Sequence, residues 1–222
     1  MPSTVVHMAF AGLLAAALLG EYFDRRAVAV VLAVTALPDL DAFVGLVSTV
    51  GHRTAGHTLV IPAVVAVLWA VDTRVREESL VRARWGEWGV AVGWMSILAV
   101  VVSGIGLDLV TGGVNPLWPI HDQLYRVTGR IELSSQRGIV QTFVDLSPEA
   151  PESGGGNAGP QRLGNSSEVF VSTGVDPTPG DEPEQVERIF PVVRSGWQLL
   201  LLVTGTAVTA GKLAIVERGD RQ

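Results

Sequence analysis

The 222-residue sequence contains no cysteine, which excludes disulfides, cysteine-ligated zinc and thiol catalysis. Lysine is nearly absent: Lys212 is the single lysine, and arginine supplies the other 15 of the 16 basic residues. The net charge is −6 and no basic stripe is available to neutralise phosphates, so we expect no nucleic-acid partner. Metal binding or acid–base catalysis would therefore have to come from histidine and carboxylates.

Charged residues of both signs are scarce, at 17% of the chain, whereas apolar residues reach 48%. This composition favours a membrane protein. The clearest span is residues 89–107, nineteen residues without a charge, which follow Trp85 and Trp88 where an aromatic belt would lie. Further spans are predicted at residues 5–20, 59–71 and 197–211.

Two of the apolar runs have alternatives. Residues 5–20 have the length of a signal peptide, but the preceding MPST lacks a basic region. The run at residues 27–37 is too short to cross a hydrocarbon core of about 30 Å, so it either continues through PDLD to about Val50 or stops in a protein-lined polar cavity. We predict an all-α fold: a multi-pass transmembrane helical bundle of about five spans with a flexible acidic loop.

The chain divides into three predicted parts. Residues 1–144 form a helical membrane domain, residues 145–190 an acidic, Pro/Gly-rich flexible loop, and residues 191–222 a C-terminal transmembrane helix with a short tail. The loop assignment follows from nine carboxylates against one arginine in residues 145–187, which cannot bury enough apolar area to offset ordering. Before the loop, the runs IEL and IVQTFV predict a small hairpin around QRG.

Charge bias predicts the orientation of the bundle. Arginines concentrate in the turn at residues 25–26 and the loop at residues 74–84, and further basic residues follow in the tail after residue 211. With five spans, these segments share one side, which the positive-inside rule assigns to the cytoplasm. The polar residues then fall together on the non-cytoplasmic side of the cell membrane: His7, Asp39, Asp41, His52, His57, Asp108 and His121.

The segment PDLDAFVGLVSTVGHRTAGHT, residues 38–58, carries most of this polar chemistry. The alternate spacing of Asp39 and Asp41 points two carboxylates in about the same direction, which suits a divalent cation, although Asp is also common at the start of a helix. His52 and His57 are five residues apart and cannot share a helix face, but they can converge within a loop. Arg53 suits a phosphate or a carboxylate, and a lipid headgroup contact is the alternative.

His7 precedes the first span and Asp108 ends the fourth, where an acid at membrane depth needs a partner or a metal ion. The turn-rich run TGGVNPLWPIH would bring His121 back over the same site. Each residue alone has an ordinary structural explanation. The hypothesis of a metal site depends on their meeting at one end of the bundle.

The ordered motifs PDLD, HRTAGHT and LDLVTGGVNPLWPIH, with a histidine near the amino terminus, resemble the YdjM-like family of membrane-bound metal-dependent hydrolases, also called LexA-binding inner-membrane hydrolases. The resemblance covers roughly residues 1–125. More faintly, the pattern resembles zinc-dependent phospholipase C. These resemblances imply a helical fold, one to three metal ions held by His and Asp, and phosphoester hydrolysis.

The chain departs from the family at one position. Family members have a histidine four residues before the aspartate that corresponds to Asp108, whereas this chain has Gly104 there. Three consequences stay open: His121 substitutes as a ligand, the site holds fewer ions, or catalysis has been lost.

The leading hypothesis is a membrane-embedded hydrolase that acts on a phosphoester such as a lipid headgroup. A divalent metal, zinc in the first place and manganese as the alternative, would be held by His7, Asp39, Asp41, His52, His57, Asp108 and His121. Arg53 would hold the phosphate, and whichever of Asp39 and Asp41 is not a ligand would act as general base. The alternatives are a non-catalytic membrane protein whose His/Asp cluster is structural or conducts ions or protons, and a helical scaffold with a partner-binding loop.

Overall fold

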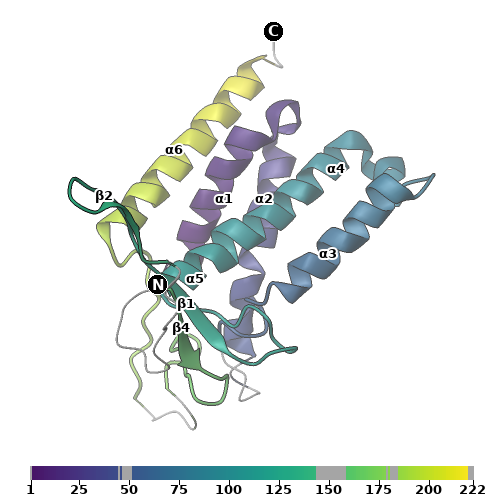
Figure 1. Cartoon of the computed structure of the whole chain (residues 1–222). Helices are drawn as coiled ribbons and strands as arrows, with labels where there is room; N and C mark the ends of the chain where they lie inside the picture. The colour runs from purple at the N-terminus through teal and green to yellow at the C-terminus, as the bar shows by residue number, and fades with distance from the viewer. Residues whose placement is uncertain are drawn as a thin grey trace.

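A computed structural model of the protein describes residues 2–44, 46, 52–143, 159–178, 180 and 185–219. Helices run roughly side by side and the strands lie at one end of them (Figure 1). The helices are α1 (Thr4–Leu18), α2 (Arg25–Ala36), α3 (Val60–Ala70), α4 (Leu80–Ala99), α5 (Leu107–Thr111) and α6 (Gly196–Gly219). A π-helical turn, Val71–Val75, extends α3, and a π-helical segment, Val100–Gly106, joins α4 to α5.

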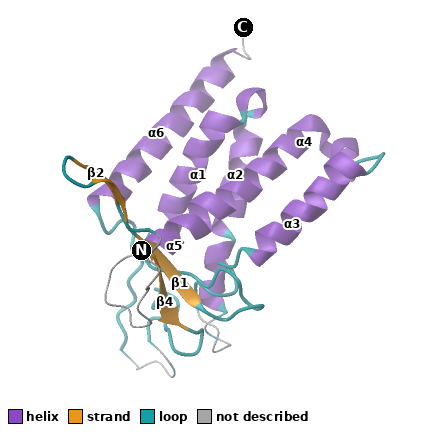
Figure 2. Ribbon diagram, in the orientation of Figure 1, coloured by secondary structure: helices purple, strands orange, loops and turns teal. Residues whose placement is uncertain are grey.

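The prediction of an all-α fold is wrong, because two small antiparallel sheets follow α5 (Figure 2). Strand β2 (Ile131–Ser134) pairs with β3 (Gly138–Gln141), with Ser134 opposite Gly138, which confirms the predicted hairpin. Strand β1 (Leu124–Thr128) pairs with β4 (Gly159–Gly164). The second pairing joins segments about 30 residues apart in sequence, a distance over which local patterns carry no information.

Strand β4 lies within residues 145–190, which the sequence predicted as a flexible acidic loop. Of that segment, residues 145–158, 179 and 181–184 lie outside the described residues. The described remainder before α6 is mostly turns, bends and irregular backbone. The division of the chain into three parts stays a prediction.

The prediction of about five membrane spans is also wrong. Within the described ranges, two helical stretches are long and apolar enough to cross a membrane, Leu80–Thr111 and Gly196–Gly219. Helix α1 has 15 residues, α2 has 12 and α3 has 11. At about 1.5 Å per residue these helices reach roughly 16 to 23 Å, short of a core of about 30 Å. The number of predicted spans was therefore too high because short apolar segments were counted as spans.

Small residues let the helices pack closely. The core between α1, α2 and α4 contains the fully buried Ala11, Ala15, Val31 and Ala99. Helix α6 lies along α1, and a Cβ on Gly205 would stand 2.3 Å from the carbonyl oxygen of Ala9. Such contacts between backbones are typical of helices that pack without large side chains between them.

Helix α2 ends where Pro38 begins a 3₁₀ helix, Pro38–Phe43. Of the two predicted alternatives for this run, the structure has the one in which the helix stops in a polar, protein-lined region, since Asp41 is only 3% exposed. This stop places Asp39 and Asp41 at the end of the bundle where α3 begins and α5 lies (Figure 1).

The N-terminus of α2 contacts α4 through Asp24, and a substitution there tests the packing of these two helices. Asp24 caps α2 by accepting a hydrogen bond from the Ala27 amide, and its other oxygen accepts from Trp88 Nε1 of α4 at 2.9 Å. We expect Asp24→Ala to lower the free energy of unfolding by about 1 to 3 kcal/mol, since it removes a cap and leaves the indole N–H without its partner. Thermal melts of the purified protein should give a lower Tm, with Asp24→Asn between Asp24→Ala and wild type, because its amide oxygen keeps the cap while its NH2 group cannot accept from the indole. An unchanged Tm for Asp24→Ala would contradict this description of the α2–α4 contact.

Candidate metal centre

The two aspartates of PDLD take different positions in the structure. Asp39 Oδ2 accepts a hydrogen bond from the Thr4 hydroxyl at the start of α1, and the Asp39 side chain is 16% exposed. Asp41 is turned inward toward residues 52–57. The 3₁₀ geometry that follows Pro38 separates the roles of two carboxylates that the sequence treated alike.

The Asp41 carboxylate organises the loop before α3. Its Oδ1 pairs with His52 Nδ1 at 2.5 Å, and its Oδ2 pairs with His57 Nδ1 at 3.0 Å. The same Oδ2 accepts from the backbone amides of Arg53 and Gly56. Because a carboxylate only accepts, both Nδ1 atoms must carry protons, which leaves Nε2 of each neutral ring free to bind a cation.

Gly56 is required for this loop to close. A Cβ at that position would stand 2.2 Å from the Pro38 carbonyl oxygen and 3.0 Å from Asp41 Oδ2. Any side chain would therefore push the loop away from the carboxylate that holds it.

Arg53 reaches the site through an uncommon backbone conformation. Its φ is 72°, in the left-handed region that residues with a Cβ seldom adopt. Asp41 holds the Arg53 amide, and the Arg53 carbonyl oxygen accepts from Asn115. These bonds fix the strained residue and direct its guanidinium inward, where it is 1% exposed.

Asp108 of α5 is the third buried carboxylate of the site. Its Oδ1 lies 2.7 Å from Arg53 Nη2, and its Oδ2 lies 3.4 Å from His57 Nε2. On the other side, His7 Nε2 lies 3.6 Å from Oδ1. Asp108 therefore lies between two histidines and an arginine that come from different parts of the chain.

The orientation of His7 is fixed by Ser103. His7 Nδ1 lies 2.5 Å from the Ser103 carbonyl oxygen, and the Ser103 hydroxyl donates to the His7 carbonyl oxygen. Since a carbonyl accepts only, Nδ1 carries the proton and Nε2 of the neutral ring presents its lone pair toward Asp108. Two lone-pair groups facing each other repel unless a proton or a cation lies between them.

A set of possible metal ligands results. Asp39, His52, His57 and Asp108 each offer one ligand atom, and these four atoms lie within 4.8 Å of one another. Among the residues that the structure describes, the buried His57 Nε2 has no hydrogen-bond partner, and it faces Asp39 Oδ1 at 3.3 Å as well as Asp108. A buried polar atom without a partner is costly, so this nitrogen is where a cation would compensate most.

The charges of the site lead to the same expectation. Asp39, Asp41 and Asp108 carry three negative charges, and Arg53 is the arginine that pairs with them. If the histidines are neutral, two of these negative charges have no compensating cation among the described residues. A divalent cation would balance them.

The titration of the loop residues reflects this charge. Burial lowers the pKa of His57, but its interactions with Asp108, Asp39 and Asp41 outweigh burial and raise the pKa well above its ordinary value. Burial raises the pKa of Asp41, yet the two histidines that bond it bring that pKa below its usual range. A proton on His57 thus occupies the nitrogen that a metal ion would need.

The structure brings together seven of the eight residues selected from the sequence: His7, Asp39, Asp41, His52, Arg53, His57 and Asp108. His121 lies apart, exposed, with Nε2 at 3.0 Å from the Tyr125 hydroxyl. In this arrangement it supplies no ligand in place of the histidine that the resemblance implies at position 104. A Cβ on Gly104 would face Pro38 and Thr35 at 3.8 to 3.9 Å, so the position has room for a side chain.

Sequence reasoning missed the residues that orient the ligands. Thr4, Ser103 and Gly56 hold Asp39, His7 and the loop in place. Ser103 lies within the π-helical segment Val100–Gly106, which precedes Asp108. No motif marks such a segment, although π-helical turns are frequent at functional sites.

Comparison with known proteins supports the predicted family. The model of the YdjM inner membrane protein family matches residues 1–155, well over half of the chain and all the residues of the centre. No curated protein and no solved structure matches the chain, and the fainter resemblance to zinc-dependent phospholipase C stays a prediction. Two helices with the length and composition of membrane spans agree with an inner-membrane location. The chain belongs to the YdjM inner membrane protein family.

Proposed function

We propose that the protein binds one divalent metal ion through Asp39, His52, His57 and Asp108 and uses it to hydrolyse a phosphoester, such as that of a lipid headgroup. The observation that carries the proposal is the buried His57 Nε2, which faces two carboxylates and has no hydrogen-bond partner in the described part of the chain. The negative charge of the three carboxylates, which Arg53 balances only in part, is the second observation that supports a bound cation.

Zinc is the first choice of metal. Two imidazoles and two carboxylates form a four-ligand set of the kind zinc accepts, and manganese is the alternative because it also binds carboxylates well. Asp41 supplies the support that such sites need, since its hydrogen bonds from both Nδ1 atoms fix the ring orientations. His7 is a further ligand candidate at the edge of the set.

When bound, such an ion supplies a water of lowered pKa and a Lewis acid for the phosphoryl oxygen. The protein's own groups would position the substrate and move the proton. Asp39 is the carboxylate of the site with the most exposed side chain, so we assign it the role of general base or exchangeable ligand. Asp41 is fully engaged by four hydrogen bonds, and we assign it an orienting role.

Arg53 was predicted from the sequence to hold the phosphate. Its guanidinium is buried, paired with Asp108 and bonded to the Gly113 carbonyl oxygen at 3.2 Å. Within the described ranges, Arg53 Nε has no hydrogen-bond partner. We propose that Arg53 positions Asp108, and that direct contact with a phosphate would require this ion pair to open.

A lipid substrate follows from the position of the site in a membrane protein. The centre lies at the end of the bundle with α5 and the strands, whereas the α1–α2 turn, the α3–α4 turn and the end of α6 lie at the other end (Figure 1). Those three segments carry basic residues such as Arg25, Arg74 and Arg218. In the two stretches long enough to span a membrane, Leu80–Thr111 and Gly196–Gly219, Arg82 and Arg218 lie near the ends away from the centre, so the positive-inside rule favours the centre at the non-cytoplasmic surface.

A non-catalytic role is the second candidate, favoured by the buried Arg53–Asp108 ion pair and by Gly104 in place of a histidine. In that case the cluster would be a purely structural network. The two candidates differ in metal content, because a structural network of ion pairs needs no metal ion.

The first prediction concerns metal content. We expect the purified full-length protein, without a histidine tag, to contain about one zinc or manganese ion per chain. His57→Ala and the less buried His52→Ala should each lose most of it, while His121→Ala, a histidine outside the cluster, should keep it. Elemental analysis beside circular dichroism measures this. Well-folded wild-type protein without metal after incubation with either ion would favour the structural candidate.

The second prediction concerns pH. The pKa of His57 is raised by its carboxylate neighbours, so a proton and a metal ion compete for Nε2. Below that pKa, metal affinity should fall about tenfold for each unit that the pH is lowered. Competition titration against a chromophoric chelator at a series of pH values measures the slope. An affinity that does not change between weakly acidic and weakly alkaline pH would contradict His57 as a ligand.

The third prediction concerns activity. Asp39→Asn preserves the shape of the side chain and its acceptor for Thr4 but removes the charge, so we expect kcat for phosphate release from a lipid phosphoester to fall about 100-fold or more. Glu187→Gln, the same change at an exposed position away from the centre, should leave kcat unaltered. Equal rates for Asp39→Asn and wild type would exclude the role assigned to Asp39.

A further inference from the structure

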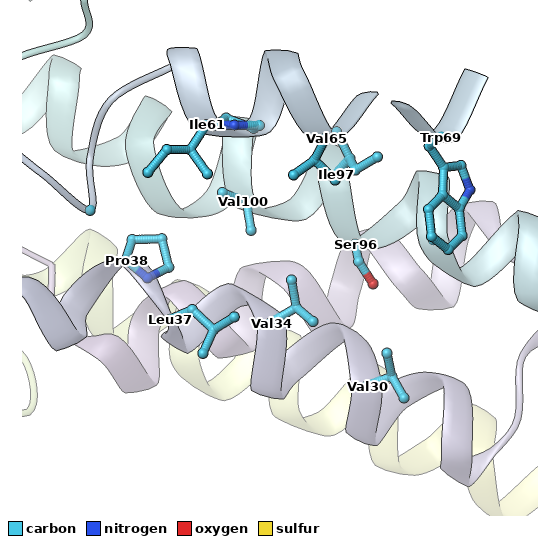
Figure 3. Close-up of a pocket in the computed structure, with 13 residues that line it drawn as sticks. Val30, Val34, Leu37, Pro38, Ile61, Val65, Trp69, Ser96, Ile97 and Val100 are labelled. Atoms are coloured by element: carbon cyan, nitrogen blue, oxygen red, sulfur yellow. The ribbon is translucent and has the colours of Figure 1, made fainter. Parts of the chain in front are cut away.

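An apolar groove adjoins the metal centre. A cavity of about 390 Å³ lies between α2, α3 and α4 (Figure 3). Aliphatic side chains line most of it, and Ser96 contributes a hydroxyl. The aliphatic lining includes Val30, Val34, Leu37, Ile61, Val65 and Val100.

One end of the groove meets the centre. Pro38 and Gly56 both line it, Pro38 precedes Asp39 in sequence, and the Gly56 amide donates to Asp41. Figure 3 shows Pro38, Leu37 and Ile61 at one end, and Val30 and Trp69 at the other. From Val30 to Pro38 the groove follows α2 for roughly 12 Å.

Trp69 closes the far end. Its indole packs on Gly93 of α4, where an added Cβ would stand 2.0 Å from the ring. The glycine thus lets the indole lie against the helix backbone. The length of the groove is therefore limited by Trp69 at the end away from the centre.

The side of the groove is open and its rim is apolar. Leu37 is 55% exposed, Ile61 53% and Val65 41%, although all three line the cavity. In a membrane protein, an open apolar rim of this kind faces hydrocarbon, because exposed apolar patches in water are unfavourable. An acyl chain can therefore enter sideways while its headgroup stays at the surface.

We propose that the groove between α2, α3 and α4 binds one acyl chain of the lipid whose phosphoester is presented to the metal centre, and so selects the substrate by chain length. This proposal rests on the proposed function and names its substrate class as single-chain or multi-chain phospholipids with at least one chain of medium length. The volume supports it: at roughly 30 Å³ for each water-sized unit, the groove holds about thirteen units, and a methylene group is of similar size. Chains near twelve carbons would fill it.

Two variants of α3 provide a matched pair for the test. Val65→Phe adds a ring inside the groove, whereas Val67→Phe adds the same ring on a residue of α3 that does not line it and is 61% exposed. The probe is dodecyl phosphate with a diazirine at the twelfth carbon, added to the full-length protein in nanodiscs of unlabelled phosphatidylcholine. Labelled residues are mapped by mass spectrometry after irradiation.

We expect wild-type protein to be labelled at the far end of the groove, near Val30 and Trp69. Val65→Phe should reduce that labelling about tenfold, since filling an occupied site is costly. Val67→Phe should leave it within about twofold of wild type. Labelling confined to the outward face of α3, or equal loss in both variants, would overturn the proposal, as would crosslinks between two protein chains in place of lipid adducts.

Phosphate release separates this proposal from the proposed function. We expect Val65→Phe to slow release from dodecyl phosphate about tenfold while sparing butyl phosphate, whose chain does not reach the added ring. If the groove is labelled but neither compound releases phosphate, the proposed hydrolysis would be contradicted and acyl-chain binding in the groove would stand. If both variants release phosphate at the wild-type rate and labelling occurs only outside the groove, the proposed hydrolysis would stand and acyl-chain binding in the groove would be contradicted.

Discussion

The Asp41 carboxylate holds the centre together through four hydrogen bonds. It bonds His52 and His57 at Nδ1, and it accepts from the amides of Arg53 and Gly56. Because one carboxylate fixes both rings and the loop backbone, the positions of the remaining ligand atoms depend on it. Gly56 makes this possible by leaving space against the Pro38 carbonyl oxygen.

Burying this much charge next to apolar helices needs compensation. Within the described part of the chain, the three carboxylates meet Arg53 and three histidines at one end of the bundle. An isolated carboxylate there would be costly. Removing one partner of a buried ion pair destabilises a protein more than replacing the whole pair by apolar residues, because the remaining charge is left buried without a partner. A divalent cation that interacts with Asp39 and Asp108 together would lower this cost, and the same cation would support the proposed hydrolysis. Stability and the proposed chemistry therefore depend on the same set of residues.

In the proposed function, the groove would connect the centre to the membrane. Pro38 ends α2, directs Asp39 to the centre and also lines the apolar cavity. One break in a helix therefore creates both the polar end and the mouth of the groove. A substrate with a charged head and an apolar chain matches that junction, whereas a water-soluble phosphoester would use only half of it.

Residue order along the chain grouped seven residues that lie together in the structure, but it did not predict the contacts that each one makes. The two aspartates of PDLD and the two histidines of HRTAGHT converge because the helix stops at Pro38, a local signal that can be read from the sequence. The distinction between Asp39 and Asp41 depends on contacts with Thr4 and with residues 52–57, which no local pattern encodes. His121 was grouped with the centre only by the expected topology, and it bonds Tyr125 instead.

The predicted number of spans was wrong and the β1–β4 sheet was not predicted, for related reasons. Helices α1 and α3 were predicted as spans because their sequences are apolar, but at 15 and 11 residues they are too short to cross the hydrocarbon core. The β1–β4 pairing involves the acidic segment, whose polarity indicated a loop. The local hairpin, with its turn at QRG, was predicted because both strands and the turn are adjacent in sequence.

The central claim is that His52 and His57 bind a metal ion together with two carboxylates. X-ray absorption spectroscopy at the zinc edge of the zinc-loaded protein tests it most directly. We predict a first shell of nitrogen and oxygen at about 2.0 to 2.2 Å with the outer-shell scattering of two imidazoles, reduced to one imidazole in His52→Ala. A first shell without imidazole scattering, or one that His52→Ala leaves unchanged, would contradict the account.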